Sequence, residues 1–460
     1  MVLMDVTRRQ MTNSAPGEIP GRGPMMQFTH LKTFPEAGFK EVVRPNFDTL
    51  YSLAWVDISK EPAILSVPEI KDRFYMMPIL DMWTDVFAVI GTYGTGTGAG
   101  EYALCLPDWK GDLPKDVKRI DAPTSMLWIL GRTQTNGPKD YDYIHKIQAQ
   151  YRIKPLSQYG KEYQPPFKKD PTVDDKTPPL NQVEKMDGKT YFNYAMALMK
   201  NYPPHITDMV MVSRMQRIGL VPDGFDFDKL PADVQDALNQ AARVSHDTMR
   251  QYIPRLGYDA NGWQMTTKSI GVYGNDYLQR ATINLIRLGA NPYEQAIYPL
   301  NTMDKNGKPP EGGKKYVMHF DKDQLPPVEA FWSITMYDQA CLRPRDRFWD
   351  IPVPKIDSAF DNLLVPQPSW SPSTTQQLRK LVAAPYLAPN DWTPRSEAYF
   401  VFPLAQGTPG KQCGLAATGD YQPSLRSPWL AAEEGFHVEN SLNRFAIGDR
   451  DELKFDDDGS

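Results

Sequence analysis

The densest group of residues that could do chemistry lies in one short segment, from Val43 to Ser52. Within eight positions it brings together a cation, an amide, a carboxylate and a phenol: Arg44, Asn46, Asp48 and Tyr51. Pro45 keeps the residue before it extended, and Asn or Asp side chains bind nearby backbone to fix a turn. A salt-bridged turn would use the same residues. We treat the arginine, the aspartate and the tyrosine as candidate catalytic residues, and the asparagine as a candidate ligand-binding residue.

A second group lies in the segment Leu80–Ile90, whose alternation predicts a strand. Asp81 and Asp85 share one face of that strand with Trp83. At about 3.3 Å per residue the two carboxylates would be roughly 13 Å apart, too far for an acid and base pair unless a bulge intervenes. A carboxylate among aromatic side chains is costly unless it is hydrogen-bonded. Asp81 is thus either a structural anchor or a candidate catalytic residue, and Trp83 is a candidate ligand-binding residue.

Recognised motifs for cofactors and nucleophiles are missing from the sequence. No two of the six histidines lie within five residues, so none forms the close pair typical of a metal site. The glycines of Gly91–Gly100 lack G-x-G-x-x-G spacing and lead into a strand, which favours a hairpin loop over a nucleotide site. There is no G-x-S-x-G motif, and Cys105 lies in an apolar strand. The motifs therefore indicate no metal and no cofactor.

Composition limits the class of protein. The chain has 460 residues, 41% of them hydrophobic, which is enough to build folded cores. A net charge of −5 without a basic block makes nucleic acid a poor partner, and no stretch approaches the roughly 18 apolar residues of a membrane span. The first ten residues lack the apolar core of a signal peptide, so we expect a soluble, cytoplasmic protein. A periplasmic or secreted protein stays open if the N-terminus is incomplete.

Strand patterns dominate the first part of the chain and return near Ala330. Short runs rich in aromatic and β-branched residues predict strands at Leu50–Ile58, Phe74–Ile79, Glu101–Leu106 and Ser125–Gly131. A later pair, Lys315–Phe320 and Ala330–Tyr337, adds His319 and Trp332 as candidate ligand-binding residues.

Between these strands, apolar residues spaced three and four apart predict four helices. Their expected start and stop residues are Asp187, Thr207 or Asp208, Gly219, Pro254, Asp276 and Gly289. We therefore predict an α+β protein, mainly β, with two β-sandwich-like domains joined by a helical layer. The expected parts are an N-terminal arm (1–30), a β-domain (31–153), a proline-rich linker (154–182), a helical region (183–262) and a second β-domain (263–460) interrupted by an insertion (341–435).

Four segments of the chain resemble a known two-domain family of bacteria and fungi. Val43–Trp55 and Tyr75–Thr84 resemble domain of unknown function 1254, and Pro326–Asp338 and Asn440–Arg450 look like domain of unknown function 1214. The resemblance covers most of 30–340 and 436–460. It implies two β-sandwich-like domains with helices between them, assembled as a homo-oligomer, and no settled activity.

The sequence departs from that family pattern in two places. Residues 341–435 hold 13 prolines, which predicts that they form no regular strand and loop out, leaving Phe331–Asp338 and Phe436–Ile447 packed together. The chain also stops at Ser460, before further strands that the pattern leads us to expect. A divergent protein or an imperfect gene model would each explain both departures, and we favour the second.

Two functions fit these residues. One is an enzyme or enzyme-like protein that acts on a small organic molecule in degradative or secondary metabolism, with its pocket where the β-domains meet. The other is a non-catalytic binding protein for a carbohydrate or an apolar ligand. Catalysis needs a perturbed titratable group near the ligand. We expect Arg44, Asp48 and Asp81 to converge; burial of both aspartates in salt bridges would favour the binding protein.

Overall fold

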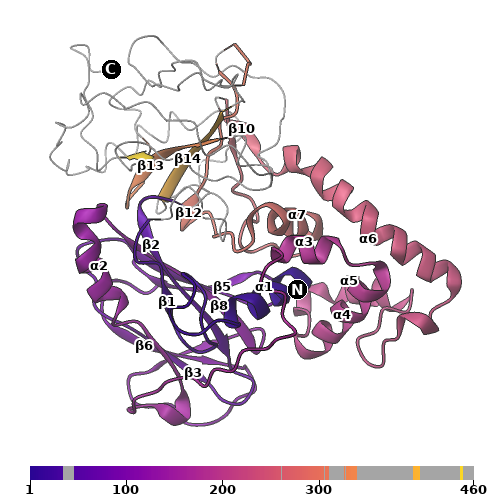
Figure 1. The fold of residues 1–460 in the computed structure, drawn as a ribbon, viewed down its shortest axis with the longest axis horizontal. Coiled ribbons are helices and arrows are strands. Elements are labelled where there is room, and N and C mark those ends of the chain that lie inside the picture. The colour runs from indigo at the N-terminus through magenta and orange to yellow at the C-terminus, as the bar shows by residue number, and fades with distance from the viewer. Residues whose placement is uncertain are drawn as a thin grey trace. The chain divides into compact units, whose positions relative to one another are not determined.

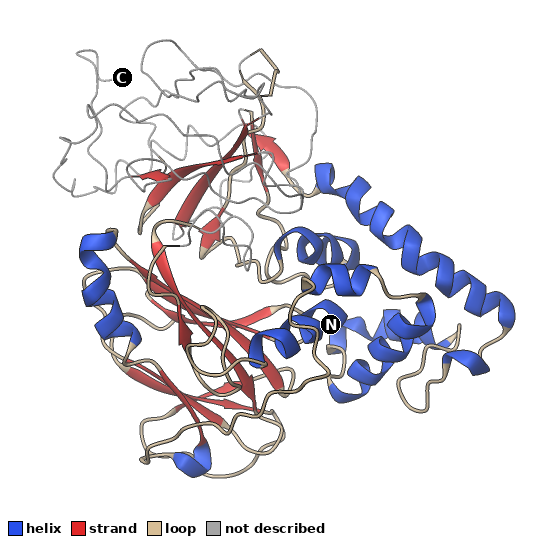
Figure 2. Ribbon diagram, in the orientation of Figure 1, coloured by secondary structure: helices blue, strands red, loops and turns tan. Residues whose placement is uncertain are grey.

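The computed structural model of the chain consists of two compact units. The first unit comprises Met1–Thr33, Thr49–Tyr252 and Ser269–Asn291, and the second comprises Phe34–Asp48, Ile253–Lys268 and Pro292–Ser460. The structure describes residues 1–34, 46–260, 262–304, 306–309, 326, 328–338, 397–404 and 446–448, with 336–338, 397–404 and 446–448 described as backbone alone. Figures 1 and 2 show the helices and strands of both units.

A five-stranded antiparallel sheet forms the centre of the first unit, in the order β1-β2-β8-β4-β5. Its strands are β1 (Thr29–His30), β2 (Thr49–Asp57), β4 (Tyr75–Leu80), β5 (Val86–Gly91) and β8 (Met126–Gln134). β2 pairs with β8 along its whole length, and every residue of β2 except the last is buried. A layer of helices lies on one side of this sheet and a second sheet lies on the other (Figure 2), so that both faces of β2 are buried.

The second sheet of this unit has the order β7-β6-β3-β9. Its strands are β3 (Ala63–Val67), β6 (Gly100–Cys105), β7 (Lys118–Asp121) and β9 (Arg152–Pro155). The predicted hairpin at Gly91–Gly100 is wrong, because this loop leaves β5 in the first sheet and enters β6 in the second. Gly91 begins the crossing at φ 140°, and a Cβ atom there would lie only 2.4 Å from the Tyr75 carbonyl oxygen. Only glycine fits that position.

The four predicted helices are confirmed as α4 (Gly188–Asn201), α5 (Met209–Gln216), α6 (Ala232–Tyr252) and α7 (Tyr277–Arg287). Asp187 and Asp276 cap α4 and α7 as predicted, their carboxylates accepting from the backbone N–H groups of Thr190 and Gln279. Three further helices are α1 (Val2–Thr12), α2 (Tyr141–Gln148) and α3 (Pro179–Glu184). None of the described helices is long and apolar enough to cross a membrane.

A cluster of sulfur and indole side chains packs the N-terminal helix against the central sheet. Met4 of α1 lies fully buried with Trp55 and Trp128, which are register partners on β2 and β8. The two indole rings stack with centroids 4.8 Å apart and an interplanar angle of 6°. This packing makes α1 part of the core of the first unit.

The described sheet of the second unit has the order β12-β14-β13-β15. Its strands are β12 (Ala296–Ile297), β13 (Trp332–Asp338), β14 (Glu397–Leu404) and β15 (Ala446–Gly448), beside the ribbon β10 (Tyr258–Ala260) and β11 (Trp263–Met265). β13 pairs with β15, which confirms that the chain on either side of 341–435 comes together.

The prediction that residues 341–435 contain no strand is wrong, because β14 lies within them and pairs in parallel with both β12 and β13. The run Glu397–Phe402 is free of proline and rich in aromatic residues, a strand signal that the high proline count of the whole segment hides. The predicted strand Lys315–Phe320 lies outside the described residues. With helices and largely antiparallel sheets together, the fold is α+β.

Candidate functional site

A tight turn between β4 and β5 brings together the two aspartates of the Leu80–Ile90 segment. The Asp81 N–H donates to the Asp85 carbonyl oxygen at 3.0 Å, and the Thr84 N–H donates to the Asp81 carbonyl oxygen at 3.1 Å. The prediction of one continuous strand with carboxylates roughly 13 Å apart is therefore wrong. Thr84 has φ 71°, a left-handed conformation that is rare for a β-branched residue. Alternating side chains gave no sign of this turn.

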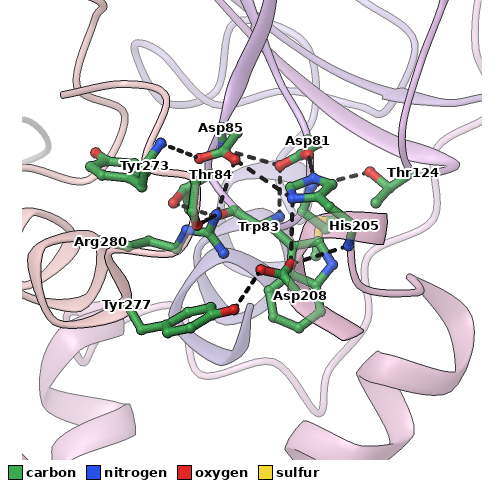
Figure 3. Close-up of polar contacts among 12 residues, drawn as sticks. Asp81, Trp83, Thr84, Asp85, Thr124, His205, Asp208, Tyr273, Tyr277 and Arg280 are labelled. Carbon is green, nitrogen blue, oxygen red and sulfur yellow. Dashed lines mark hydrogen bonds and ion pairs between the residues drawn. The ribbon is translucent and has the colours of Figure 1, made fainter. Parts of the chain in front are cut away.

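Asp81 is the most buried member of the site, with 0% of its surface exposed. Its Oδ1 accepts from the backbone N–H groups of Trp83 at 2.8 Å and Asp85 at 3.1 Å. Its Oδ2 lies 2.5 Å from Nε2 of His205 (Figure 3). The two backbone donors fix the carboxylate so that its second oxygen faces the imidazole.

His205 stands among three carboxylates, and 18% of its side chain is exposed. Besides Asp81, its Nδ1 lies 3.6 Å from Oδ2 of Asp85 and 3.6 Å from Oδ2 of Asp208. The backbone N–H of His205 donates to Asp208 at 3.2 Å, at the start of the short 3-10 helix Ile206–Asp208. The hydrogen bond to Asp81 raises the pKa of His205 above its ordinary value, although burial opposes it.

One face of α7 completes the site with residues spaced three and four apart. Tyr277 donates its hydroxyl to Oδ1 of Asp208 at 2.9 Å, and Arg280 donates from Nη2 to Oδ2 of Asp85 at 3.0 Å. Asn284 donates to the Thr84 hydroxyl at 2.7 Å. Residues at these intervals lie on the same side of a helix. α7 therefore holds the β4–β5 turn through Arg280 and Asn284, and it holds Asp208 through Tyr277; Figure 3 shows the Arg280 and Tyr277 contacts.

Burial and charge act in opposite directions on Asp85. Burial raises the pKa of this carboxyl, and the positive charge of Arg280 opposes the rise. With every group ionised, the three aspartates against His205 and Arg280 give a charge of −3 + 2 = −1. Perturbed carboxyl and imidazole groups in contact are typical of acid–base sites and also of structural ion networks.

Trp83 fixes the segment that precedes His205. Its indole Nε1 donates to the carbonyl oxygens of Tyr202 at 3.2 Å and Pro203 at 3.1 Å. Its ring centroid lies 6.3 Å from that of His205. The structure therefore places this predicted ligand-binding residue beside the imidazole, with its indole N–H engaged by the protein.

The Asn46 and Asp48 pair forms a separate polar group in the second unit. Asn46 Oδ1 accepts from the Asp48 N–H at 2.9 Å, the local turn that the sequence predicts. Asp48 is 3% exposed, and its Oδ2 accepts from the hydroxyl of Ser333 on β13 at 2.6 Å. Trp332, the residue before Ser333 on that strand, is buried against Ile297.

The other predicted site residues are divided between the units. Tyr51 is buried on β2 of the first unit, with the guanidinium carbon of Arg132 5.3 Å from its ring centroid. Arg44 and His319 lie outside the described residues. The convergence of Arg44, Asp48 and Asp81 stays a prediction, since Asp48 belongs to the second unit and Asp81 to the first.

His205 and Arg280 are members of the site that the sequence did not indicate. His205 could have been found from Asp208, an aspartate three residues later at the start of a helix. Arg280 could have been found as a charged residue on the apolar side of a helix. Within the described residues, no group of three or more His, Cys, Asp or Glu side chains is arranged to hold a metal ion. The aspartates here are instead bound by N–H and O–H donors.

Comparisons with known proteins identify two families of unknown function along the chain. The model named "Protein of unknown function (DUF1254)" matches residues 25–155, and "Protein of unknown function (DUF1214)" matches residues 295–348. No curated protein matches the chain. The crystal structure of the VPA0106 protein from Vibrio parahaemolyticus is similar in fold, with a TM-score of 0.52 and 19% identity over 76% of this chain and 80% of that chain. Asp81 and Asp85 fall inside the first match. The chain therefore carries a DUF1254 domain and a DUF1214 domain, as the resemblance of its sequence implies.

Proposed function

We propose that the protein is an enzyme that acts on a small organic molecule, with His205 as the group that exchanges a proton with it. The observation that carries this proposal is the fixed Asp81 carboxylate, 2.5 Å from an imidazole that is itself partly exposed. A general acid or base must be oriented and must titrate near the working pH, and histidine is the side chain that does so most readily.

The surroundings of His205 support catalysis in two further ways. Asp81 acts as a positioning residue, because its carboxylate holds the ring through Nε2 and favours the imidazolium. The turn beside it keeps Thr84 in a left-handed conformation, and strain of this kind is concentrated at functional sites. Neither feature is needed to fill a core.

Turnover of a metabolite mixture, followed by mass spectrometry, tests the proposal. Once a substrate is identified, His205→Gln should lower kcat by about 10²- to 10⁴-fold, the usual contribution of a general acid or base. Asp81→Asn should lower kcat and shift its pH profile to lower pH, because the imidazolium loses its stabilising partner. His246→Gln, a substitution on α6 of the same unit, is the control. Undiminished turnover by His205→Gln would refute the assignment.

Burial of Asp48 and Asp81, with Asp81 ion-paired to His205, favours a second candidate. In this alternative the cluster is an anchor that ties the β4–β5 turn to the helices, and the protein binds a carbohydrate or an apolar ligand without converting it. Equilibrium binding separates the two. A binding protein would take up its ligand unchanged, and His205→Gln would alter its melting temperature alone.

A further inference from the structure

Arg280 carries more hydrogen-bond donors than its described partners accept. The residue is 7% exposed, and its Nη2 is used by Asp85 and by the carbonyl oxygen of Gly274 at 3.3 Å. Its Nε and Nη1 atoms are buried and have no hydrogen-bond partner within the described part of the chain. Nε bears one hydrogen and Nη1 bears two, so three of the five guanidinium donors have no acceptor among the described residues. Buried donors are nearly always paired in native proteins.

A second unpaired atom lies on the same face of α7. The Nδ2 of Asn284 donates to Thr84, whereas its Oδ1 is buried without a partner among the described residues. Arg280 and Asn284 are four residues apart and therefore adjacent on the helix surface. Two neighbouring side chains on this face of α7 therefore have polar atoms without a hydrogen-bond partner among the described residues.

The donors of Arg280 are close to the surface of the first unit. The ring of Tyr273 lies 5.8 Å from the guanidinium carbon, and Gly274 accepts from Nη2. Val272, Gly274 and Asn275 in the same loop are exposed. The guanidinium therefore lies against residues 273–274, in a loop that has exposed residues.

The charge of the site selects among anions. A guanidinium presents a planar set of donors that matches a carboxylate. The three aspartates outnumber the cationic side chains of His205 and Arg280, giving −3 + 2 = −1. The Met1 amino group also interacts with Asp81 and Arg280, but burial lowers its pKa to about 6, so it adds little positive charge at neutral pH. Like charges disfavour one another at short range, so a dianion such as phosphate is opposed more strongly than a monoanion.

We propose that the substrate of this site is a small monocarboxylate, and that its carboxylate binds the free donors of Arg280 beneath the 273–274 loop. The inference rests on the proposed function, because it assigns a substrate class to the cluster in which His205 would transfer the proton. Arg280 is then the binding residue and His205 the reacting residue.

Equilibrium binding of matched acid and amide probes tests the inference. Acetate, lactate and benzoate, with acetamide, lactamide and benzamide as neutral counterparts, are titrated into the whole chain by calorimetry, and melting temperatures are recorded in parallel. We expect at least one carboxylate to bind and raise the melting temperature, its amide to bind at least tenfold more weakly, and inorganic phosphate to bind more weakly than that carboxylate. Arg280→Gln should weaken carboxylate binding at least tenfold, and Arg280→Lys should retain part of it.

Arg243→Gln, an exposed residue on α6, makes the same chemical change outside the site and should bind as the native protein does. Failure of every carboxylate to bind, equal binding of acid and amide, tighter binding of phosphate, or full binding by Arg280→Gln would overturn the inference. If Arg280→Gln does not fold, the comparison of acid and amide binding to the native chain still shows whether the site selects a carboxylate.

His205→Gln keeps this test separate from that of the proposed function. The variant should still bind the carboxylate through Arg280, and more tightly than the matching amide, while losing turnover. Carboxylate binding through Arg280 together with unchanged turnover by His205→Gln would refute the proton-transfer role and leave the binding site standing.

Discussion

Two buried aspartates, Asp81 in the first unit and Asp48 in the second, are satisfied in different ways. Asp81 accepts two backbone N–H groups and faces an imidazole that can gain or lose a proton. Asp48 accepts from the hydroxyl of Ser333, a group that does not titrate near neutral pH. Burial is common to both carboxylates. Because the histidine that faces Asp81 can change its protonation state, the Asp81 site is a candidate for chemistry.

The two sites also differ in how far their partners lie along the chain. Asn46 is two residues from Asp48, and the turn that they form follows from local side-chain chemistry. His205 is 124 residues from Asp81, and Arg280 is 195 residues from Asp85. A site assembled from distant segments depends on the fold, so no spacing in the sequence reveals it.

Among the substitutions considered, Asp81→Asn should lower the free energy of unfolding most. It removes a buried charge from His205, and breaking a buried ion pair costs about 3 to 5 kcal/mol. We expect a loss of about 2 to 4 kcal/mol in the free energy of unfolding, because 18% of the imidazole side chain is exposed and water can partly replace the carboxylate. Urea denaturation at pH 6 measures this loss, with the exposed Asp108→Asn as control. A loss no greater than that of the control would show that the pair does not stabilise the first unit.

A smaller effect is expected at the Asp48 site. Ser333→Ala removes a hydroxyl that donates to a buried carboxylate, which should cost about 1.5 to 3 kcal/mol. A double-mutant cycle with Asp48→Asn isolates the contact from other changes in packing. Additive losses in that cycle would mean that the hydroxyl and the carboxylate do not interact energetically.

Much of the fold follows from local signals. Asp187 and Asp276 mark the starts of α4 and α7, because a carboxylate at the N-cap satisfies free backbone N–H groups wherever it occurs. The turn at Met82–Thr84 had no such signal, since it contains no Gly, Pro, Asn or Asp between its two aspartates. It is held by long-range contacts, including the Met82 N–H donating to Thr124 Oγ1 at 3.1 Å.

The candidate site was predictable only in part. Asp81 could be singled out because a charge among aromatic residues needs a partner. The identity of that partner could not, because His205 follows two prolines in a segment whose position depends on the packing of α4 and α5. Arg280 was hidden for the same reason: its pairing with Asp85 exists only once α7 lies against the turn.

The Asp81 site and the Asp48 site should also differ in how their contribution to stability depends on pH. His205 has a raised pKa, so its contribution is fully present below pH 6.5, the ordinary value, and is lost as the pH rises through the folded pKa. Asp85 also has a raised pKa, which makes stability fall above its ordinary value of 3.8. The slope cannot exceed about 1.4 kcal/mol per pH unit for each proton.

Melting temperatures between pH 5 and 9 measure this effect. The native protein should lose its advantage over His205→Gln as the pH rises above 6.5. The difference between native protein and Ser333→Ala should stay constant over the same range, because the serine does not titrate. A constant difference for His205→Gln as well would mean that the imidazole gains no proton on folding.

The smallest expected effect is that of Tyr277→Phe, at the outer edge of the Asp81 site. The change removes the hydroxyl that donates to Asp208 at 2.9 Å and leaves the ring in place. Because the tyrosine is only half-buried, water can replace part of the lost bond, and we expect about 0.5 to 1.5 kcal/mol. Asp208 also accepts from the backbone of His205, so a weaker hold on this carboxylate should loosen the imidazole. Urea denaturation measures the first effect and the pH profile of turnover the second; a changed stability with an unchanged profile would confine Tyr277 to a structural role.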